Sequence, residues 1–274
     1  MKTLKLLALT LSLACSTVFA AEAKKGGEKL PPALDVPPIG TSAPILNVDF
    51  EDTAAGQIPK GFTKQGAVSV VEDVAHSGKK SLKMEAAVSG GRQIVLKGDV
   101  LKQLGGTFWG RFYYKVQTPT PMPEKGVIHS TMVAGSAQSP SAKDPIEVRM
   151  LGSVQGAKGT FQYLYNVQPR SKRPEFGKGT SYRFNYSDQW TLAEWYVDYA
   201  TQTYRLFING EEVTDCSFKK GEGKFEGADL PEIYESLTFG WCNYQQAGKG
   251  FVCWIDDIAL AKDRIGTRGI PGAK

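Results

Sequence analysis

Side chains suited to proton transfer and to binding a carboxylate group occur on short segments that have the alternating pattern of β-strands. In Pro145–Met150 the apolar residues fall on one face of a strand, so Glu147 and Arg149 point together to the other face. A planar guanidinium binds a carboxylate through two hydrogen bonds, and histidine or tyrosine side chains such as His129 and Tyr244 can exchange protons with a substrate. Two charges on one strand face are equally typical of a solvated surface.

Other polar and aromatic residues on neighbouring segments are candidates for binding a substrate. The segment Phe161–Gln168 places two tyrosines on one face and Gln162, Asn166 and Gln168 on the other. Tyrosines on strands more often pack and form hydrogen bonds than perform chemistry. The predicted substrate-binding residues are Glu147, Tyr163, Tyr165, Asn166, Trp241 and Gln245.

The composition and motif content exclude several classes of protein. The chain has 274 residues, of which 41% are hydrophobic and 22% charged, a composition typical of globular proteins. It has two histidines and four cysteines, which exclude a multi-histidine metal site and a disulfide scaffold. Haem-attachment, Rossmann and P-loop motifs are absent from the sequence.

The first twenty residues have the pattern of an export signal. Lys2 and Lys5 form a positive region, residues 6–14 an apolar core, and Val18-Phe19-Ala20 a cleavage site with small residues. The apolar core is too short to span a bilayer. We therefore expect residues 1–20 to be a signal peptide cleaved after Ala20, and the protein to be secreted or periplasmic. A lipoprotein signal centred on Cys15 is the alternative.

The rest of the chain predicts a linker followed by one all-β domain. Residues 21–44 are rich in Pro, Gly and Lys and predict a flexible linker. From residue 45 to 274, short β-type runs alternate with turns, which indicates a two-sheet antiparallel sandwich or jelly roll. Residues 99–104 and 230–237 are expected to form short helical turns.

Two hairpins are expected in the second half of the domain. The Asn209-Gly210 pair fits a type I′ turn, in which both central residues need positive φ. A loop around residues 246–250 joins the last two strands and would place Cys242 opposite Cys253. A disulfide there suits an oxidising compartment, and two buried free thiols are the alternative.

Three motifs carry a resemblance to a family of secreted proteins. FEDTAAGQIPKGF (50–62), HSGKKSL (76–82) and WIDDIALAKDRIG (254–266) resemble segments of the cellulose-induced secreted proteins of fungi and bacteria. These are similar to the glucuronan lyases of polysaccharide lyase family 20, and the likeness extends over residues 46–267. The resemblance implies a concanavalin A-like β-jelly roll. It also implies a secreted lyase that cleaves a uronic-acid-containing polysaccharide, glucuronan- or alginate-like, by β-elimination.

Three further segments resemble the Arg, His and Tyr strands of jelly-roll alginate lyases: IEVRM, VIHS and FGWCNYQ. The likeness is one of groove chemistry and not of alignment, because Val127 stands where those enzymes have Gln and His129 precedes Arg149. β-Elimination removes the C5 proton of a uronic acid and expels the oxygen at C4. In this scheme Arg149 neutralises the carboxylate, His129 or a tyrosine takes the proton, Tyr244 protonates the leaving oxygen and Glu147 orients Arg149. No metal is needed for this step.

The resemblance also implies a structural calcium ion between the first and last strands. The matching positions are Asp49 or Glu51, the loop of residues 76–79 with Ser77, and Asp256. Carboxylate and carbonyl oxygens suit Ca²⁺. Acidic residues that merely end edge strands are the alternative.

Two other functions remain open at this stage. A non-catalytic carbohydrate-binding jelly roll would use aromatic surfaces such as Trp109, Trp190, Trp195 and Trp241, although burial is the default for each. A glycoside hydrolase would need two acids across a groove, for which Glu147 and Glu194 are the candidates. The expected partner is an anionic polysaccharide; neither nucleic acid nor a membrane span is expected, and the protein is expected to be a monomer.

Overall fold

The alternation of apolar and polar residues along the strands produces two antiparallel sheets that pack through their apolar faces. The computed structural model describes residues 36–156, 158–222, 229–246 and 248–270. The expected signal peptide with Cys15, most of the expected linker and the last four residues lie outside the described residues. The strands belong to a unit that begins at Pro37.

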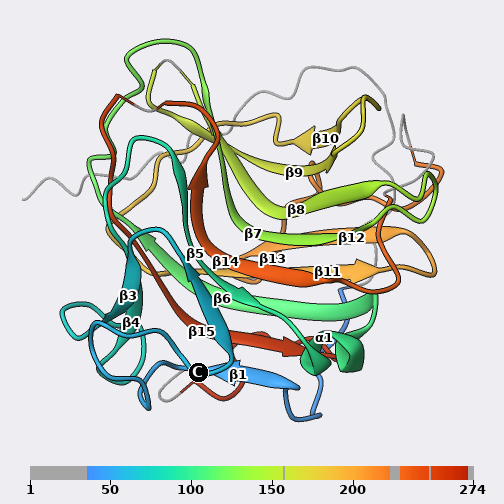
Figure 1. Ribbon diagram of the computed structural model, residues 1–274, viewed down its shortest axis with the longest axis horizontal. Helices are drawn as coiled ribbons and strands as arrows, with labels where there is room; N and C mark the ends of the chain where they lie inside the picture. Colours follow the sequence, from blue (N-terminus) through green and yellow to red (C-terminus); the bar gives the residue numbers. More distant parts are fainter. Residues whose placement is uncertain (1–35, 157, 223–228, 247, 271–274) are drawn as a thin grey trace, which may run out of the picture. The chain divides into compact units, whose positions relative to one another are not determined.

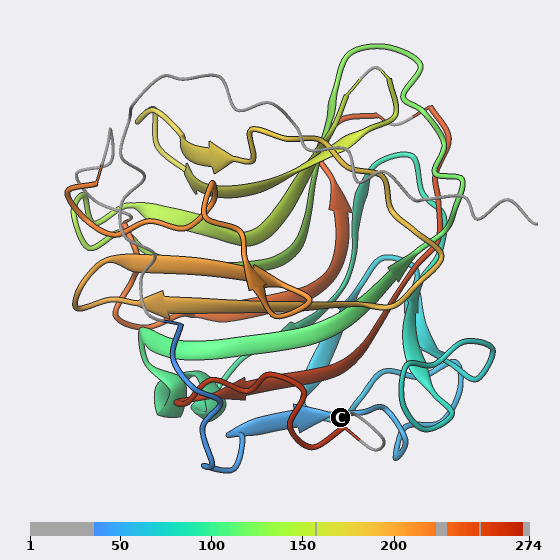
Figure 2. The same ribbon diagram turned by 180° about the vertical axis from the view of Figure 1, so that it is seen from behind.

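Views from two opposite sides show the strands in two layers (Figures 1 and 2). In the described chain, the eight-stranded sheet has the order β13 (Glu211–Glu212), β12 (Thr203–Ile208), β11 (Thr191–Asp198), β6 (Thr107–Val116), β15 (Cys253–Ala261), β4 (Ser81–Met84) and β3 (Val68–Val71), with β1 (Leu46–Val48) paired to β15. The seven-stranded sheet has the order β10 (Phe176–Gly179), β9 (Phe161–Pro169), β8 (Pro145–Gln155), β7 (Ile128–Gln138), β14 (Ser236–Asn243), β5 (Gly90–Leu96) and β2 (Phe62–Gln65).

The long strands of the seven-stranded sheet bend along their length (Figure 1). Three of these strands carry a shift of register: β7 between Thr131 and Ala134, β8 between Arg149 and Gly152, and β14 between Phe239 and Cys242. An extra residue in one strand increases the local twist and turns the strand. These bulges curve the sheet and re-aim the side chains beyond them.

The core between the sheets is apolar and aromatic. Trp195 of β11 packs against Phe112 of β6 and Phe239 of β14, with ring centroids 5.6 Å and 6.5 Å away. Its indole also lies against Gly110, where a Cβ atom would overlap the ring. Gly110 is therefore required by close packing and not by its backbone conformation.

Two local predictions are confirmed and one is wrong. Residues 99–104 form the helix α1 (Asp99–Leu104), and Asn209 and Gly210 have the positive φ angles, 51° and 84°, of the expected turn. Residues 230–235 form no helix. The backbone N–H of Leu230 donates to the Gln202 side chain and that of Glu235 to the carbonyl of Ser136, so tertiary contacts replace helical hydrogen bonds.

The predicted Cys242–Cys253 disulfide is also wrong. Cys242 lies on β14 in the seven-stranded sheet, whereas Cys253 begins β15 in the other sheet. The loop between them crosses from one sheet to the other instead of closing a hairpin. Both thiols are free, as is that of the buried Cys216.

Candidate functional site

The candidate site lies on the outer face of the seven-stranded sheet. In β8, Ile146, Val148 and Met150 are at most 1% exposed and belong to the core. Glu147 and Arg149 alternate with them and are part-exposed on the other face. Because β7 and β14 lie next to β8 in the same sheet, their outward side chains share this face.

Arg149, Glu147 and Tyr244 form a hydrogen-bonded cluster. Glu147 Oε1 accepts a hydrogen bond from Arg149 Nε at 2.6 Å and another from the Tyr244 hydroxyl at 2.8 Å. The Arg149 guanidinium carbon lies 3.8 Å from the centre of the Tyr244 ring, which is the geometry of a cation–π contact. Within the described part of the chain, Nη1 and Nη2 of Arg149 make no hydrogen bond, so both remain available to a ligand.

His129 lies beside this cluster on the next strand. The backbone N–H of Tyr244 donates to the carbonyl of His129 at 3.0 Å, which makes the two residues cross-strand neighbours. Ser130 and Asn243 are bonded to each other inside the sandwich, so His129 and Tyr244, one position along each strand, point outward. Side chains directly opposed in this way have Cβ atoms about 5 Å apart. Gln245 fixes this end of the sheet, because its Oε1 accepts the backbone N–H of His129 at 2.6 Å.

The surroundings of Tyr244 favour its protonated form. Partial burial raises the pKa of the Tyr244 phenol well above its ordinary value, and the negative charge of Glu147 raises this pKa further. A phenol with a raised pKa keeps its proton at neutral pH and can donate it. Burial likewise raises the pKa of the neighbouring Cys242 thiol, which therefore stays protonated.

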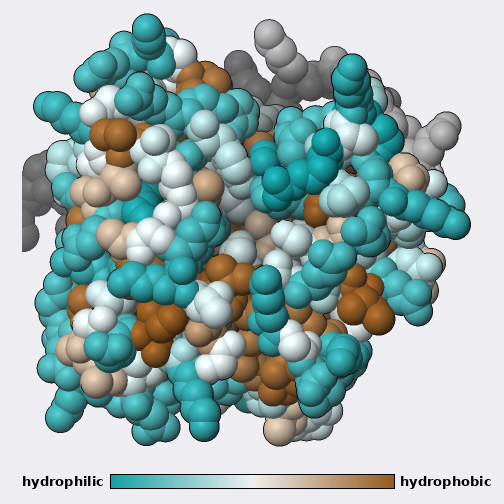
Figure 3. All heavy atoms as spheres, in the orientation of Figure 1, coloured by the Kyte–Doolittle hydropathy of each residue, from teal (hydrophilic) through white to brown (hydrophobic). Residues whose placement is uncertain are grey.

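The cluster borders a groove of about 280 Å³. Its lining comes from β2, β5, β7, β8 and β14, and from Arg170 just after β9. The charged residues of this lining are Lys97, Glu147 and Arg170, and Arg170 Nη2 lies 3.6 Å from Glu147 Oε2. With Arg149 beside them, cations outnumber carboxylates here. In Figure 3, hydrophobic side chains form small patches between hydrophilic ones on the side of the molecule in view.

Sequence reasoning missed several groove residues. Gln93 and Val95 of β5, and Lys97 directly after it, line the groove; their spacing of two residues is that of one strand face. Cys242 also lines the groove, although its type and spacing suggested a disulfide. Arg170 reaches the groove from a loop, and no local pattern indicates that position.

Three of the predicted substrate-binding residues lie in the core instead. Tyr163 and Tyr165 are 5% and 0% exposed, and Trp241 is 0% exposed. Tyr163 is bonded to Tyr114 of the other sheet, and the Trp241 indole N–H donates to Asn243. Their side chains therefore fill the space between the sheets and do not reach a ligand in the groove. Both faces of β9 carry residues able to bind sugars, so alternation alone did not decide which face turns inward.

Asn166 occupies the outer face but is covered. It is the register partner of Arg149 in the next strand, yet it is 1% exposed because Glu175 lies over it and accepts its side-chain hydrogen bond. Contact between Asn166 and a ligand would therefore require Glu175 to move.

The acid pair of the hydrolase hypothesis is not formed. Glu194 is on β11 of the eight-stranded sheet, 1% exposed, and bonded to Arg264 and the backbone N–H of Gly266. Glu147 faces outward from the other sheet. Since two carboxylates must flank one glycosidic bond, this pair does not support hydrolysis.

The tryptophans named for the binding hypothesis are largely buried as well. Trp109 is 4% exposed and Trp195 is 0% exposed. Trp190 is part-buried and makes an edge contact with the ring of His76, with centroids 5.8 Å apart. None of these three rings lines the groove in the described residues.

The residues expected to hold calcium are bonded to N–H groups of the protein. Asp49 Oδ1 accepts the backbone N–H of Glu51 at 3.2 Å. Asp256 Oδ2 accepts the backbone N–H groups of His76 and Ser77 at 2.8 Å and 3.2 Å. Burial, with the adjacent charge of Asp257, raises the pKa of Asp256 to about 8.

Glu51, another expected calcium ligand, is also bonded to N–H groups of the protein. Its Oε1 accepts the backbone N–H groups of Lys79 and Lys80, each at 2.8 Å. The Lys80 ammonium donates to the carbonyl oxygens of Glu51 and Thr53 at 2.9 Å and 3.0 Å. A lysine thus occupies the carbonyl oxygens of this loop. Among the described residues no group of three or more His, Cys, Asp or Glu could hold a metal ion. The expected ligands are thus already bonded to groups of the protein, and the calcium site stays a prediction.

The two antiparallel sheets define the class: the protein is a concanavalin A-like β-jelly roll. Searches for a matching protein-family model and for a matching curated protein sequence found none. In the described residues, no helix is long and apolar enough to cross a membrane.

Among solved structures, the chain is similar to an endo-β-1,4-glucuronan lyase from the fungus Trichoderma reesei. The TM-score is 0.51 and the identity 12%, over 80% of this chain and 95% of that chain. It is also similar to the binding domain of botulinum neurotoxin serotype D, with a TM-score of 0.45 and 13% identity over 81% of this chain and 48% of that chain. The chain spans less than half the length of the toxin domains it matches. At these identities the likeness shows the fold alone.

Proposed function

We propose that the protein is a secreted or periplasmic polysaccharide lyase that cleaves a uronic-acid-containing polymer by β-elimination. The observation that carries this proposal is the cationic groove bordered by Glu147 and Tyr244, with Arg149 bonded to Glu147 and His129 the cross-strand neighbour of Tyr244. A glucuronan lyase is known with a similar jelly-roll fold. Fold alone hosts both catalysis and binding, so the proposal depends on the residues of the site.

Each step of the reaction has a suitable group. The two Nη groups of Arg149, which make no hydrogen bond to a described residue, bind the uronate carboxylate. They stabilise the negative charge that develops when the C5–H bond breaks. His129 takes that proton. The electron pair left at C5 then forms the C4=C5 double bond as the C4–O bond breaks. The C4–O pair leaves with the oxygen, which takes a proton from the Tyr244 hydroxyl. Glu147 holds Arg149 and Tyr244 in position through its Oε1.

The environment of Tyr244 supports this division of roles. A phenol whose pKa is raised is a poor base at neutral pH but keeps the proton that an acid must donate. Of the two candidate bases left by the sequence, histidine and tyrosine, His129 is therefore the better one. Histidine is the side chain that most often serves as a general base.

A non-catalytic carbohydrate-binding protein is the second candidate. The observation that favours it is the hydrogen bond from the Tyr244 hydroxyl to Glu147, which occupies the proton that a lyase must deliver. Arg149 also forms an ion pair with Glu147, which partly neutralises its charge. In a binding protein the same cluster would present a flat cation–π surface to a sugar carboxylate.

The test follows the absorbance of the unsaturated product while the protein is mixed with glucuronan, alginate or pectate. Rising absorbance with one polymer, abolished in Arg149→Ala and in His129→Ala, supports the lyase. Arg183→Ala is the matched control, because Arg183 lies beside Gly156 and outside the groove lining. A flat trace with every polymer, from a folded protein that one polymer still retards in an affinity gel, would replace the lyase by the binding protein.

A further inference from the structure

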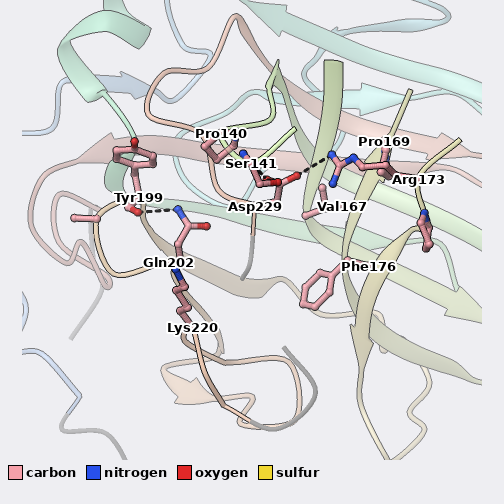
Figure 4. A pocket seen from close by; sticks show the side chains of 12 residues that line it. Pro140, Ser141, Val167, Pro169, Arg173, Phe176, Tyr199, Gln202, Lys220 and Asp229 are labelled. Carbon is pink, nitrogen blue, oxygen red and sulfur yellow. Dashed lines mark hydrogen bonds and ion pairs between the residues drawn. The ribbon is translucent and has the colours of Figure 1, made fainter. Parts of the chain in front are cut away.

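Two hollows lie beyond the groove and meet each other at Tyr199. One, of about 440 Å³, is lined by Gln138, Ile233 and Glu235 among others. The other, of about 600 Å³, is lined by Phe176, Arg173 and Lys220 among others (Figure 4). Both include Pro140 and Tyr199 in their linings. We call these two hollows together the trough.

The trough continues the groove along the same strands. The groove contains Ser136 of β7 and Ser236 of β14, and the trough contains Gln138 and Glu235, one or two positions further on. The Gln138 amide lies 3.4 Å from the Glu235 carboxylate, so the two strands stay adjacent up to this point. Gln138 is nine positions after His129 on β7, which at the rise of a β-strand is about 30 Å. A ligand that contacts both ends is therefore an oligosaccharide or longer.

The trough differs from the groove in charge. Its described charged residues are three cations and three carboxylates: Lys143, Arg173, Lys220, Asp229, Glu232 and Glu235. Arg173 is further neutralised, because its Nη2 lies 2.9 Å from Asp144 and 3.0 Å from Asp229. Figure 4 shows the pair with Asp229. The excess positive charge of the groove therefore does not extend into the trough.

The walls of the trough suit the faces of sugar rings. Tyr199, Pro140 and Phe176 contribute flat apolar surfaces from three separate segments (Figure 4). The Tyr199 hydroxyl forms no hydrogen bond with any described residue, so a ligand can use it. Asp229 holds the segment that carries Pro140, because it accepts hydrogen bonds from the hydroxyls of Ser139 and Ser141.

We infer that the polysaccharide held in the groove continues into the trough, where an uncharged ring face packs on Tyr199. This inference rests on the proposed polysaccharide function of the groove and adds a second, distal binding region. Recognition of the polysaccharide then has two parts. The groove binds the charged uronate, and the trough binds the chain by apolar contact and hydrogen bonding that salt does not screen.

The test compares Tyr199→Ala with Tyr182→Ala, an exposed tyrosine that lines neither the groove nor the trough. The substrates are the polymer that the wild type cleaves or binds and its trimer, which is too short to reach the trough from His129, about 30 Å away. For Tyr199→Ala we expect KM on the polymer to rise about five- to tenfold, the effect of truncating an aromatic binding residue. We expect no change on the trimer, and the rise should persist in high salt. Lys97→Gln in the groove should instead raise KM only at low salt.

The outcomes separate this inference from the proposed function. If the wild type cleaves the polymer and Tyr199→Ala leaves KM unchanged, the distal region is refuted and the lyase stands. If no polymer is cleaved but retardation in an affinity gel falls in Tyr199→Ala alone, the lyase is refuted and the distal region stands. If the wild type neither cleaves nor is retarded by any polymer, both are refuted. Melting temperatures of both variants check that they fold.

Discussion

Replacement of Tyr244 by phenylalanine removes one oxygen atom and separates the catalytic role of this residue from its packing. The ring that lies 3.8 Å from the Arg149 guanidinium remains, so the surface that binds a uronate changes little. What is lost is the hydroxyl bonded to Glu147 at 2.8 Å. Because Tyr244 is 37% exposed, that hydrogen bond contributes no more than about 1 kcal/mol to stability.

In a lyase the expected loss of activity is far larger than this loss of stability. A positioned general acid contributes about 10²–10⁴-fold to the rate, so kcat of Tyr244→Phe should fall by that factor while KM stays within about threefold. The initial rate of absorbance increase measures both constants. Tyr182→Phe is the control for removing a tyrosine hydroxyl from an exposed position outside the groove.

Two results would refute this reasoning. If kcat of Tyr244→Phe stays within tenfold of wild type, Tyr244 does not deliver the proton. If KM rises together with a large fall in melting temperature, the hydroxyl is structural. An unchanged affinity-gel retardation with no catalysis in either protein would favour the binding function instead.

Three further predictions follow from the described contacts. Gly110→Ala should lower the free energy of unfolding by about 1–3 kcal/mol, because the added methyl group overlaps the Trp195 indole. Urea unfolding measures this, and an unchanged midpoint would mean that the indole moves aside without cost. The pKa of Asp256 is about 8 in the folded protein and about 3.9 in an unfolded chain. Because the folded state binds the proton more tightly, the free energy of unfolding should fall as pH rises from about 4 to about 8. Thermal unfolding across that range checks this, and Asp256→Asn should flatten the profile. The melting temperature of the protein should be the same in the presence of calcium and in the presence of a chelator, because Glu51 and Asp256 already accept protein N–H groups. A clear rise of the melting temperature with calcium would support the predicted calcium site.

Several features were predictable from the sequence because they depend on near neighbours along the chain. Alternation in β8 put Glu147 and Arg149 on the face opposite Ile146 and Val148, since successive side chains of a strand point to opposite sides. The Asn209-Gly210 turn is equally local, because its two positive φ angles are a property of those residues.

Other features depend on which distant strands become neighbours. Trp241 was predicted to bind a substrate and Cys242 to form a disulfide, yet the tryptophan is in the core and the cysteine lines the groove. The sequence does not state that β14 pairs with β5 and β7 while β15 joins the other sheet. For β9, both faces carry sugar-binding residue types, so only packing against the opposite sheet selected Tyr163 for the interior.

The sequence by itself determined the fold class, the turns and the outward direction of Arg149. Only the tertiary structure decided that Arg149 lies against Tyr244 with His129 on the neighbouring strand, and that Lys97 and Arg170 line one groove with Tyr244. The physical reason is the difference in range. Alternation and turn geometry are set by a few adjacent φ and ψ angles, whereas a site assembled from five strands depends on hydrogen-bonded pairing between segments far apart in the chain.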